Sequence, residues 1–447
     1  MNTIQHTAST VAAEVNEAAN AANATNATNA KERQASRRTV FAAALGNGLE
    51  FFDFTVYSFF AAVIGKLFFP AGSELGALMM SLATFGVGFV VRPLGSIVIG
   101  AYADRVGRKQ ALVLTVSLMA LGTGMIGLAP TYATIGLAAP AIIVLGRLLQ
   151  GFSAGGEVGA ATTLLMESGS TGRRGSLVSW QMASQGGAAL AGALVAATLT
   201  RSLSHEALLA WGWRVPFLIG LLIGPLGFYL RKHLDETLPA AHAAKAGSPI
   251  AAPPKARIEW RQIVAGTMLV IGGTSSMYVI VFFLPSFLTM TTGMPAAVSL
   301  LAGCTAGLVL LIGSPLAGRL ADRMPRRKTL LYAASVVSLT VLLPAFYAIK
   351  TWPSIYTVVL VVFVLIGLMT LSSPAAFVLI LEAFKPEVRA TSLGIIYALG
   401  VTLFGGFAQL IVSALWRMSG SFYAPAWYVL ACGLVSFAGV VLFKEAK

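Results

Sequence analysis

The sequence predicts an all-α membrane protein with twelve transmembrane helices arranged in two six-helix bundles. Hydrophobic residues make up 57% of the 447 residues and charged residues only 11%, against about 25% charged in soluble domains. Apolar runs of roughly 20 residues, enough to cross a bilayer core, recur along the whole chain. One charged motif also occurs twice, which indicates a duplicated chain built from two related halves.

Each expected helix is an apolar run that ends at charged residues, glycine or proline, where a membrane span normally stops. Twelve such runs in one chain are too many for the buried helices of a single soluble core. In order, we expect spans at about 40–66, 76–100, 110–129, 134–166, 176–199, 213–231, 261–290, 296–317, 329–349, 354–382, 391–415 and 424–443.

Two segments interrupt this pattern and set the domain boundaries. Residues 1–38 are rich in Ala, Asn and Thr and lack an apolar stretch, so we expect a disordered cytoplasmic tail. Residues 232–260 contain four prolines and mixed charge, which is typical of a linker. The expected bundles are therefore 39–231 and 261–443, with a short C-terminal tail at 444–447.

The distribution of positive charge predicts the orientation of the chain. With the N-terminus inside, cytoplasmic segments hold 24 of the 31 Lys and Arg residues, and outer loops hold five. This asymmetry follows the positive-inside rule. It also accounts for the net charge of +14 without nucleic-acid binding. We expect both termini in the cytoplasm and the protein in a bacterial inner membrane.

The duplicated motif lies between the second and third expected spans. It reads Gly100-Ala-Tyr-Ala-Asp104-Arg105-Val-Gly107-Arg108-Lys109, and a partial copy follows 218 positions later at Gly318-Arg-Leu-Ala-Asp322-Arg323. Basic residues here are topology signals, but acidic residues contribute little to topology. The aspartates therefore need another explanation, and pairing with an Arg or with a helix N-terminus supplies one.

This motif resembles the signature loop of the major facilitator superfamily. The stretches Gly46-Asn-Gly-Leu-Glu-Phe-Phe-Asp-Phe54, Arg92-Pro-Leu-Gly95 and Gly146-Arg-Leu-Leu-Gln-Gly151 resemble its metabolite–proton symporters. Phe68-Phe-Pro-Ala-Gly-Ser-Glu74 and Gln150-Gly-Phe-Ser-Ala-Gly155 resemble the citrate and tricarballylate carriers. The resemblance covers roughly residues 39–443.

The resemblance implies a cytoplasmic gate that latches the two halves together in the outward-open state. In the second copy Met324-Pro325 replaces Val106-Gly107, so that turn must differ. Two further Glu and Arg pairs, each seven residues apart, close equivalent apolar runs and are expected in the same ion-pair networks. The expected gate residues are Gly100, Asp104, Arg105, Gly107, Arg108, Asp322, Arg323, Glu167, Arg174, Glu382 and Arg389.

Five ionisable residues lie well inside the apolar spans: Glu50, Asp53, Arg92, Arg147 and Glu157. Charge at the bilayer centre costs about 2.5–3.5 kcal/mol on insertion scales, so each is a functional candidate. We expect the coupling proton on Asp53, Glu50 or Glu157 and a substrate carboxylate on Arg147. Arg92 lies nearer the cytoplasmic end of its span and could serve either the site or the gate.

A guanidinium stays charged and can bind a carboxylate with two parallel hydrogen bonds. If substrate competes with Asp53 or Glu50 for Arg147, the displaced acid becomes protonated, which is symport. The alternative is a static ion pair that joins spans one and four. Polar residues on facing spans are expected to complete the substrate site or to join helices: Asn47, Tyr57, Gln150, Gln181, Gln185, Ser275, Tyr278 and Gln409.

These features predict a monomeric proton symporter in the lipid bilayer that imports a small carboxylate, citrate or tricarballylate first. A dicarboxylate, shikimate, betaine or proline remains open as substrate. A drug–proton antiporter is disfavoured because 180–200 contains no proline, and a metabolite receptor because the tails are short or polar. We expect no enzyme activity, cofactor or metal, because the sequence contains no metal cluster, nucleophile–base pair or phosphate loop.

Overall fold

The computed structural model describes residues 40–41, 43–106, 108–155, 157–169, 171–221, 224 and 259–445. Regular structure within these ranges is entirely helical. The expected tail at 1–38 and nearly all of the expected linker at 232–260 lie outside the described residues. The two domain boundaries therefore stay predictions.

The N-terminal half begins with a broken helix. Residues Ala43–Phe59 continue into α2 (Ala61–Phe68) across a bend of 64°. The remaining helices of this half are α3 (Glu74–Val90), α4 (Arg92–Val106), α5 (Arg108–Leu128), α6 (Tyr132–Ile135), α7 (Ala138–Ala154), α8 (Glu157–Glu167), α9 (Arg174–Ser202) and α10 (His205–Ala210).

The C-terminal half is built from longer helices, and two of them pass into π-helical turns at Met277–Phe283 and Thr402–Gly406. Its α-helices are α12 (Trp260–Ser276), α13 (Leu284–Thr292), α14 (Ala296–Arg323), α15 (Arg327–Thr351), α16 (Ile355–Ala383), α17 (Pro386–Val401), α18 (Ala408–Ser419) and α19 (Ala424–Leu442).

The observed helices follow the predicted spans in order. In the described part of the chain, eight helices are long and apolar enough to cross a membrane, or nine if the bent pair counts as one span. Shorter apolar helices, Val113–Leu128 and Ala138–Ala154, occupy the third and fourth predicted positions. The fourth prediction, 134–166, covers both α7 and α8, and the sixth, 213–231, is described only in part.

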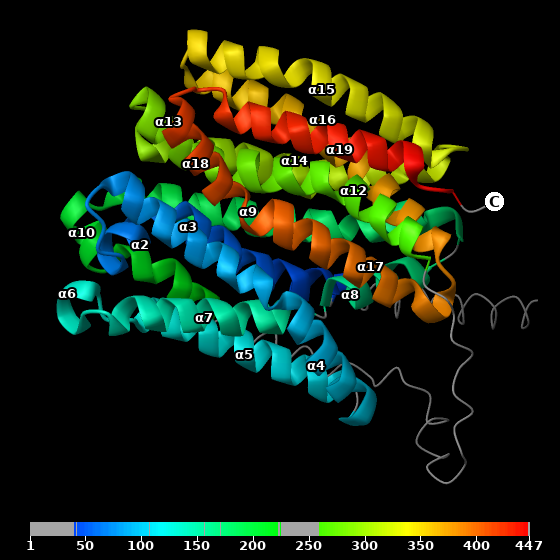
Figure 1. The fold of residues 1–447 in the computed structure, drawn as a ribbon, viewed down its shortest axis with the longest axis horizontal. Coiled ribbons are helices and arrows are strands. Elements are labelled where there is room, and N and C mark those ends of the chain that lie inside the picture. The colour runs from blue at the N-terminus through cyan, green and yellow to red at the C-terminus, as the bar shows by residue number, and fades with distance from the viewer. Residues whose placement is uncertain are drawn as a thin grey trace, which may run out of the picture.

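The two halves lie side by side, with α9 and α14 packed along each other at the boundary (Figure 1). Two pairs of glycines allow this approach. A Cβ on Gly175 would lie 2.6 Å from the Gly318 carbonyl oxygen, and a Cβ on Gly307 would lie 2.8 Å from that of Gly186. Any larger residue at these positions would push the halves apart.

Ion pairs and a helix cap join the halves at the end of the molecule predicted to be cytoplasmic, which we call the tied end. The Asp322 carboxylate on α14 accepts hydrogen bonds from the backbone N–H groups of Gly175 and Ser176, at 2.6 and 2.8 Å. It thus caps the N-terminus of α9, where a negative charge is stabilised by the helix dipole.

The duplicated Glu and Arg residues pair across the halves and not within them. Arg174 donates to Glu382 at 2.8 Å, and Arg389 donates to Glu167 at 3.0 Å. Glu382 also pairs with Arg327. Arg323 is exposed. Gly107 and the side chains of Asp104, Arg105 and Arg108 lie outside the described residues, while Gly100 belongs to α4.

Asp322→Asn is predicted to favour conformations in which the tied end is open. The amide nitrogen of Asn would face the donors of one of the two carboxylate oxygens, so the charge and part of the cap are lost at a cost of about 1–3 kcal/mol, typical of coupling energies. The measurement is the rate at which a thiol reagent labels a cysteine introduced by Ser179→Cys, in a background without Cys304 and Cys432. Ser179 is buried beside Gly318.

Glu167→Gln is the control, because Glu167 is 49% exposed and exposed pairs contribute little. Faster labelling in Asp322→Asn than in Glu167→Gln is expected. Equal labelling rates in both variants would contradict a latch at Asp322.

Candidate functional site

Four predicted ionisable side chains meet in the interior of the N-terminal half. The first helix contributes Glu50 and Asp53, α4 begins with Arg92, and α7 contributes Arg147. All four are buried, and Arg147 has no exposed surface at all. The side chain of Glu157, the fifth candidate, lies outside the described residues. We call these four residues the charged cluster.

The ring of Phe54 contacts both arginines of the cluster. The guanidinium carbon of Arg92 is 4.7 Å from the ring centroid and that of Arg147 is 4.9 Å away. Arg92 also lies 4.1 Å from the centroid of Phe89, and Arg147 lies 4.3 Å from that of Tyr57. The negative faces of aromatic rings attract cations, so these rings partly replace the lost water.

Glycines bring the arginine-bearing helices into contact. A Cβ on Gly88 would lie 2.9 Å from the carbonyl oxygen of Arg147, and a Cβ on Gly155 would overlap the carbonyl of Arg92. The close packing of α3 and α4 on α7 therefore fixes the backbone of both arginines. Gly151 packs in the same way against Gly88. This is the tight helix contact that small residues permit in membranes.

Both guanidiniums keep donors that no described residue accepts. The Nε and Nη2 groups of Arg92 and of Arg147 make no hydrogen bond within the described part of the chain. The nearest carboxylate contact is 3.5 Å, from Arg92 Nη2 to Glu50 Oε1. Buried donors without acceptors are costly. An anion bound between the arginines would satisfy them.

A chain of three hydrogen bonds links Arg147 to Asp53. Arg147 Nη1 donates to Gln150 Oε1 at 2.7 Å, and Gln150 Nε2 donates to Thr123 Oγ1 at 2.9 Å. The Thr123 hydroxyl donates to Asp53 Oδ2. A second acceptor for this hydroxyl, the Met119 carbonyl, lies 3.0 Å away. A change at Arg147 can therefore reach Asp53 through neutral side chains.

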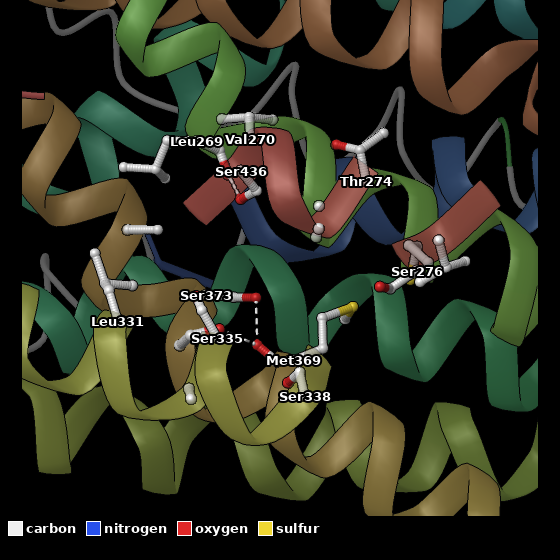
Figure 2. Close-up of a pocket in the computed structure, with 18 of the residues that line it drawn as sticks. Leu269, Val270, Thr274, Ser276, Leu331, Ser335, Ser338, Met369, Ser373 and Ser436 are labelled. Atoms are coloured by element: carbon white, nitrogen blue, oxygen red, sulfur yellow. Dashed lines mark hydrogen bonds between the residues drawn. The ribbon is translucent and has the colours of Figure 1, made fainter. Parts of the chain in front are cut away.

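A cavity lies in the C-terminal half, beside the charged cluster. It holds about 140 Å³ and is lined mainly by α12, α15, α16 and α19, with hydroxyl groups on all four helices (Figure 2). We call it the C-half cavity. Phe51, Gln185 and Tyr278 line it on the side of the N-terminal half. The Tyr278 ring lies 5.5 Å from that of Phe89, which itself contacts Arg92.

The other predicted polar residues fall into two groups. Gln185 and Tyr278 line the C-half cavity, and Gln150 and Tyr57 contact Arg147. Asn47 and Gln181 instead bind each other, with Gln181 Nε2 donating to Asn47 Oδ1 at 2.8 Å. Two residues bond elsewhere: Ser275 donates to its own helix at Gly272, and Gln409 pairs with Ser58 across the halves.

Sequence reasoning missed Phe54, Phe89 and Thr123. Thr123 is a buried polar residue, and its spacing from other polar residues of α5 gives no signal above that of an ordinary span. For Phe54, the sequence offers one signal of a functional role: it follows Asp53 in a helix segment that also contains Glu50. The roles of these residues become visible only when it is known which helices pack together.

Two apolar helical halves with a cluster of buried charges inside one of them are typical of a secondary membrane transporter. Residues 39–240 match the family described as "Sugar (and other) transporter", and residues 276–447 match "Major Facilitator Superfamily". The chain belongs to the major facilitator superfamily. It is a multi-pass transporter and not an enzyme, and the predicted fold class is confirmed.

Named relatives cover nearly the whole chain. It is 37% identical to a citrate–proton symporter of Salmonella typhi, over 91% of this chain and 94% of that protein. It is 38% identical to a citrate–proton symporter of Klebsiella pneumoniae, over 88% of each chain. It is 32% identical to an α-ketoglutarate permease of Escherichia coli strain K12, over 92% of this chain and 95% of that protein.

Solved structures share the fold at low sequence identity. The crystal structure of a D-xylose–proton symporter superposes with a TM-score of 0.73 at 20% identity, covering 92% of this chain and 98% of that one. A partially occluded inward-open form of the xylose transporter from Escherichia coli gives 0.74 at 19% identity, covering 93% and 99%.

Phe54→Leu is predicted to destabilise the protein more than the same change in an apolar site. Removing the ring leaves two buried guanidiniums without a shared partner, and each desolvated cation–π contact contributes about 2 kcal/mol. The control is Phe346→Leu, a fully buried change beside Phe422 in the C-terminal half. Thermal unfolding in detergent should give a lower Tm for Phe54→Leu. Equal Tm values would show that the ring acts by packing alone.

Proposed function

We propose that this chain imports citrate or a closely related tricarboxylate by proton symport. The observation that carries the proposal is the pair of buried arginines with unsatisfied N–H groups next to a hydroxyl-lined cavity. The similarity to two citrate–proton symporters over most of the chain supports the same substrate class.

The two arginines suit a substrate with more than one carboxylate. Each guanidinium offers Nε and Nη2 on one edge, the geometry that a carboxylate accepts with two parallel bonds. A carboxylate has two oxygens, so it can pair in this way with one guanidinium only. Two carboxylates of one substrate would take one arginine each. The hydroxyl and remaining carboxyl groups would face the C-half cavity, where neutral donors such as Tyr278 lie.

Charge balance in the cluster requires proton coupling. The described residues of the cluster comprise two acids and two arginines, so a bound anion adds negative charge to a balanced site. Unpaired charge in a low-dielectric interior is strongly unfavourable. Protonation of Asp53 or Glu50 removes this excess, and a partly protonated substrate has the same effect. Substrate and proton binding therefore favour each other.

The chain of hydrogen bonds from Arg147 to Asp53 gives this coupling a route. When a carboxylate binds the free Nε and Nη2 edge of Arg147, its negative charge offsets that of the guanidinium, and the bond from Nη1 to Gln150 weakens. Thr123 is then held less firmly by Gln150 and can turn its hydroxyl to the Met119 carbonyl. An Asp53 carboxylate without that donor is less stable, so it takes up the coupling proton. No cofactor is required beyond the protons.

The membrane potential explains why import needs protons. Moving one charge across 100 mV costs about 2.3 kcal/mol, so a trianion entering alone would face about 7 kcal/mol. Co-transported protons cancel this cost and add the pH gradient. The chain would act as a monomer in the bacterial inner membrane with both termini cytoplasmic. The tied end then faces the cytoplasm, and the halves rock about the cluster.

The testing experiment is uptake of labelled citrate into proteoliposomes with an imposed pH gradient. Uptake is expected to rise as external pH falls and to collapse with a protonophore. Unlabelled citrate or tricarballylate should compete better than α-ketoglutarate, shikimate, proline or betaine. Competition by a zwitterion but by no carboxylate would overturn the substrate class. Uptake indifferent to pH and protonophore would overturn the mechanism.

Arg147→Lys is predicted to reduce citrate uptake at least tenfold while the protein still reaches the membrane. Lys offers a point charge in place of the planar fork and cannot donate to Gln150 and a carboxylate in the same geometry. Arg417→Lys, the same change at an exposed helix end, is the control. Near-normal uptake kinetics in Arg147→Lys would remove this residue from the substrate site.

A further inference from the structure

A second cavity lies inside the N-terminal half, on another side of the charged cluster. It provides about 40 Å³ for the centres of water-sized molecules and is lined from four directions by the first helix, α5, α7 and the segment after Arg214. We call it the N-half cavity. A water molecule needs about 10–15 Å³ of such space, so about three fit.

Asp53 points an unsatisfied oxygen at this cavity. Its Oδ2 accepts from Thr123, but its Oδ1 makes no hydrogen bond within the described residues, and the side chain is 4% exposed. Gly220 keeps the space in front of Oδ1 open, because a Cβ there would lie 2.5 Å from that oxygen. A buried carboxyl oxygen beside a polar space is a position where water binds.

The N-half cavity and the C-half cavity share no lining residue. Asp53 and Glu50 line only the N-half cavity. Tyr278, Tyr397 and the serines of α12, α15, α16 and α19 line only the C-half cavity. Phe54, Phe89 and the two arginines line neither cavity. The acid that would carry the proton thus lines a cavity of its own, separate from the cavity proposed for substrate.

The N-half cavity extends from Asp53 toward the tied end. Along the first helix its lining continues from Asp53 back to Gly46, and along α5 from Thr123 back to Thr115. Seven or eight residues of helix correspond to about 10–12 Å. Ser153 on α7 and Gly224 lie on the same side, beyond Gln150 and Gly220.

We propose that the N-half cavity is a hydrated proton route from Asp53 to the tied end, separate from the substrate route. It rests on the proposed proton symport. The Asp53 carboxyl transfers its proton to a water oxygen, and the remaining carboxylate is stabilised by the Thr123 hydroxyl. The proton passes on along water held by Thr115 and Ser153. Glu50 beside it, Arg92 beyond Glu50, and Arg147 through Gln150 are the charged groups that face this step.

The test removes the two hydroxyls of the route, in the double variant Thr115→Val with Ser153→Ala. Exchange of labelled citrate across proteoliposomes needs no proton release, because the loaded carrier can return with its proton. Net citrate uptake needs release in every cycle. We expect net uptake, with internal acidification followed by a trapped pH dye, to slow at least tenfold while exchange stays within twofold.

Thr162→Val with Thr163→Val is the control, since both hydroxyls bond their own helix in α8, outside the cavity. It should leave both rates unchanged. Thr115→Ser, which keeps the hydroxyl, should also sustain net uptake. Parallel loss of exchange and net uptake, or loss of neither, would overturn the separate route. Wild-type citrate uptake without acidification would instead overturn the proposed symport itself.

Discussion

The structure depends on keeping two buried guanidiniums charged. Arg92 and Arg147 are both buried, and like charges this close repel each other. The Phe54 ring, which contacts both guanidiniums, a further aromatic ring beside each of them and the Glu50 carboxylate offset this cost. The compensation is incomplete, because N–H groups on both arginines stay without acceptors. An anion bound here would accept hydrogen bonds from these N–H groups and remove the remaining cost.

Duplication places equivalent residues where they can hold the halves together. Glu167 and Arg174 repeat as Glu382 and Arg389, and each Glu pairs with the Arg of the other half. Such exchanged pairs close only when the halves meet, so they stabilise one state and not the individual bundles. Asp322 adds a helix cap across the same boundary.

The sequence predicts the spans and the buried charges well, because the bilayer makes charge rare and apolar length necessary. Asp53, Glu50, Arg92 and Arg147 stand out for that reason, and they do meet. The partners inside the cluster could not be predicted. Phe54 is one of 25 phenylalanines, and Thr123 becomes a link only because α5 packs against α7 and the first helix. Ser275 and Gln409 show the converse, since a polar residue in a span can bond elsewhere.

In the proposed mechanism, substrate and proton bind together because Arg147 and Asp53 are linked by hydrogen bonds. Proton uptake on citrate binding measures this directly, with purified protein in weakly buffered detergent and a pH dye. The wild type should take up protons as citrate binds, and Asp53→Asn, which mimics the protonated acid, should bind citrate with a smaller uptake or none. Undiminished uptake in both Asp53→Asn and Glu50→Gln would contradict the account and place the proton site elsewhere.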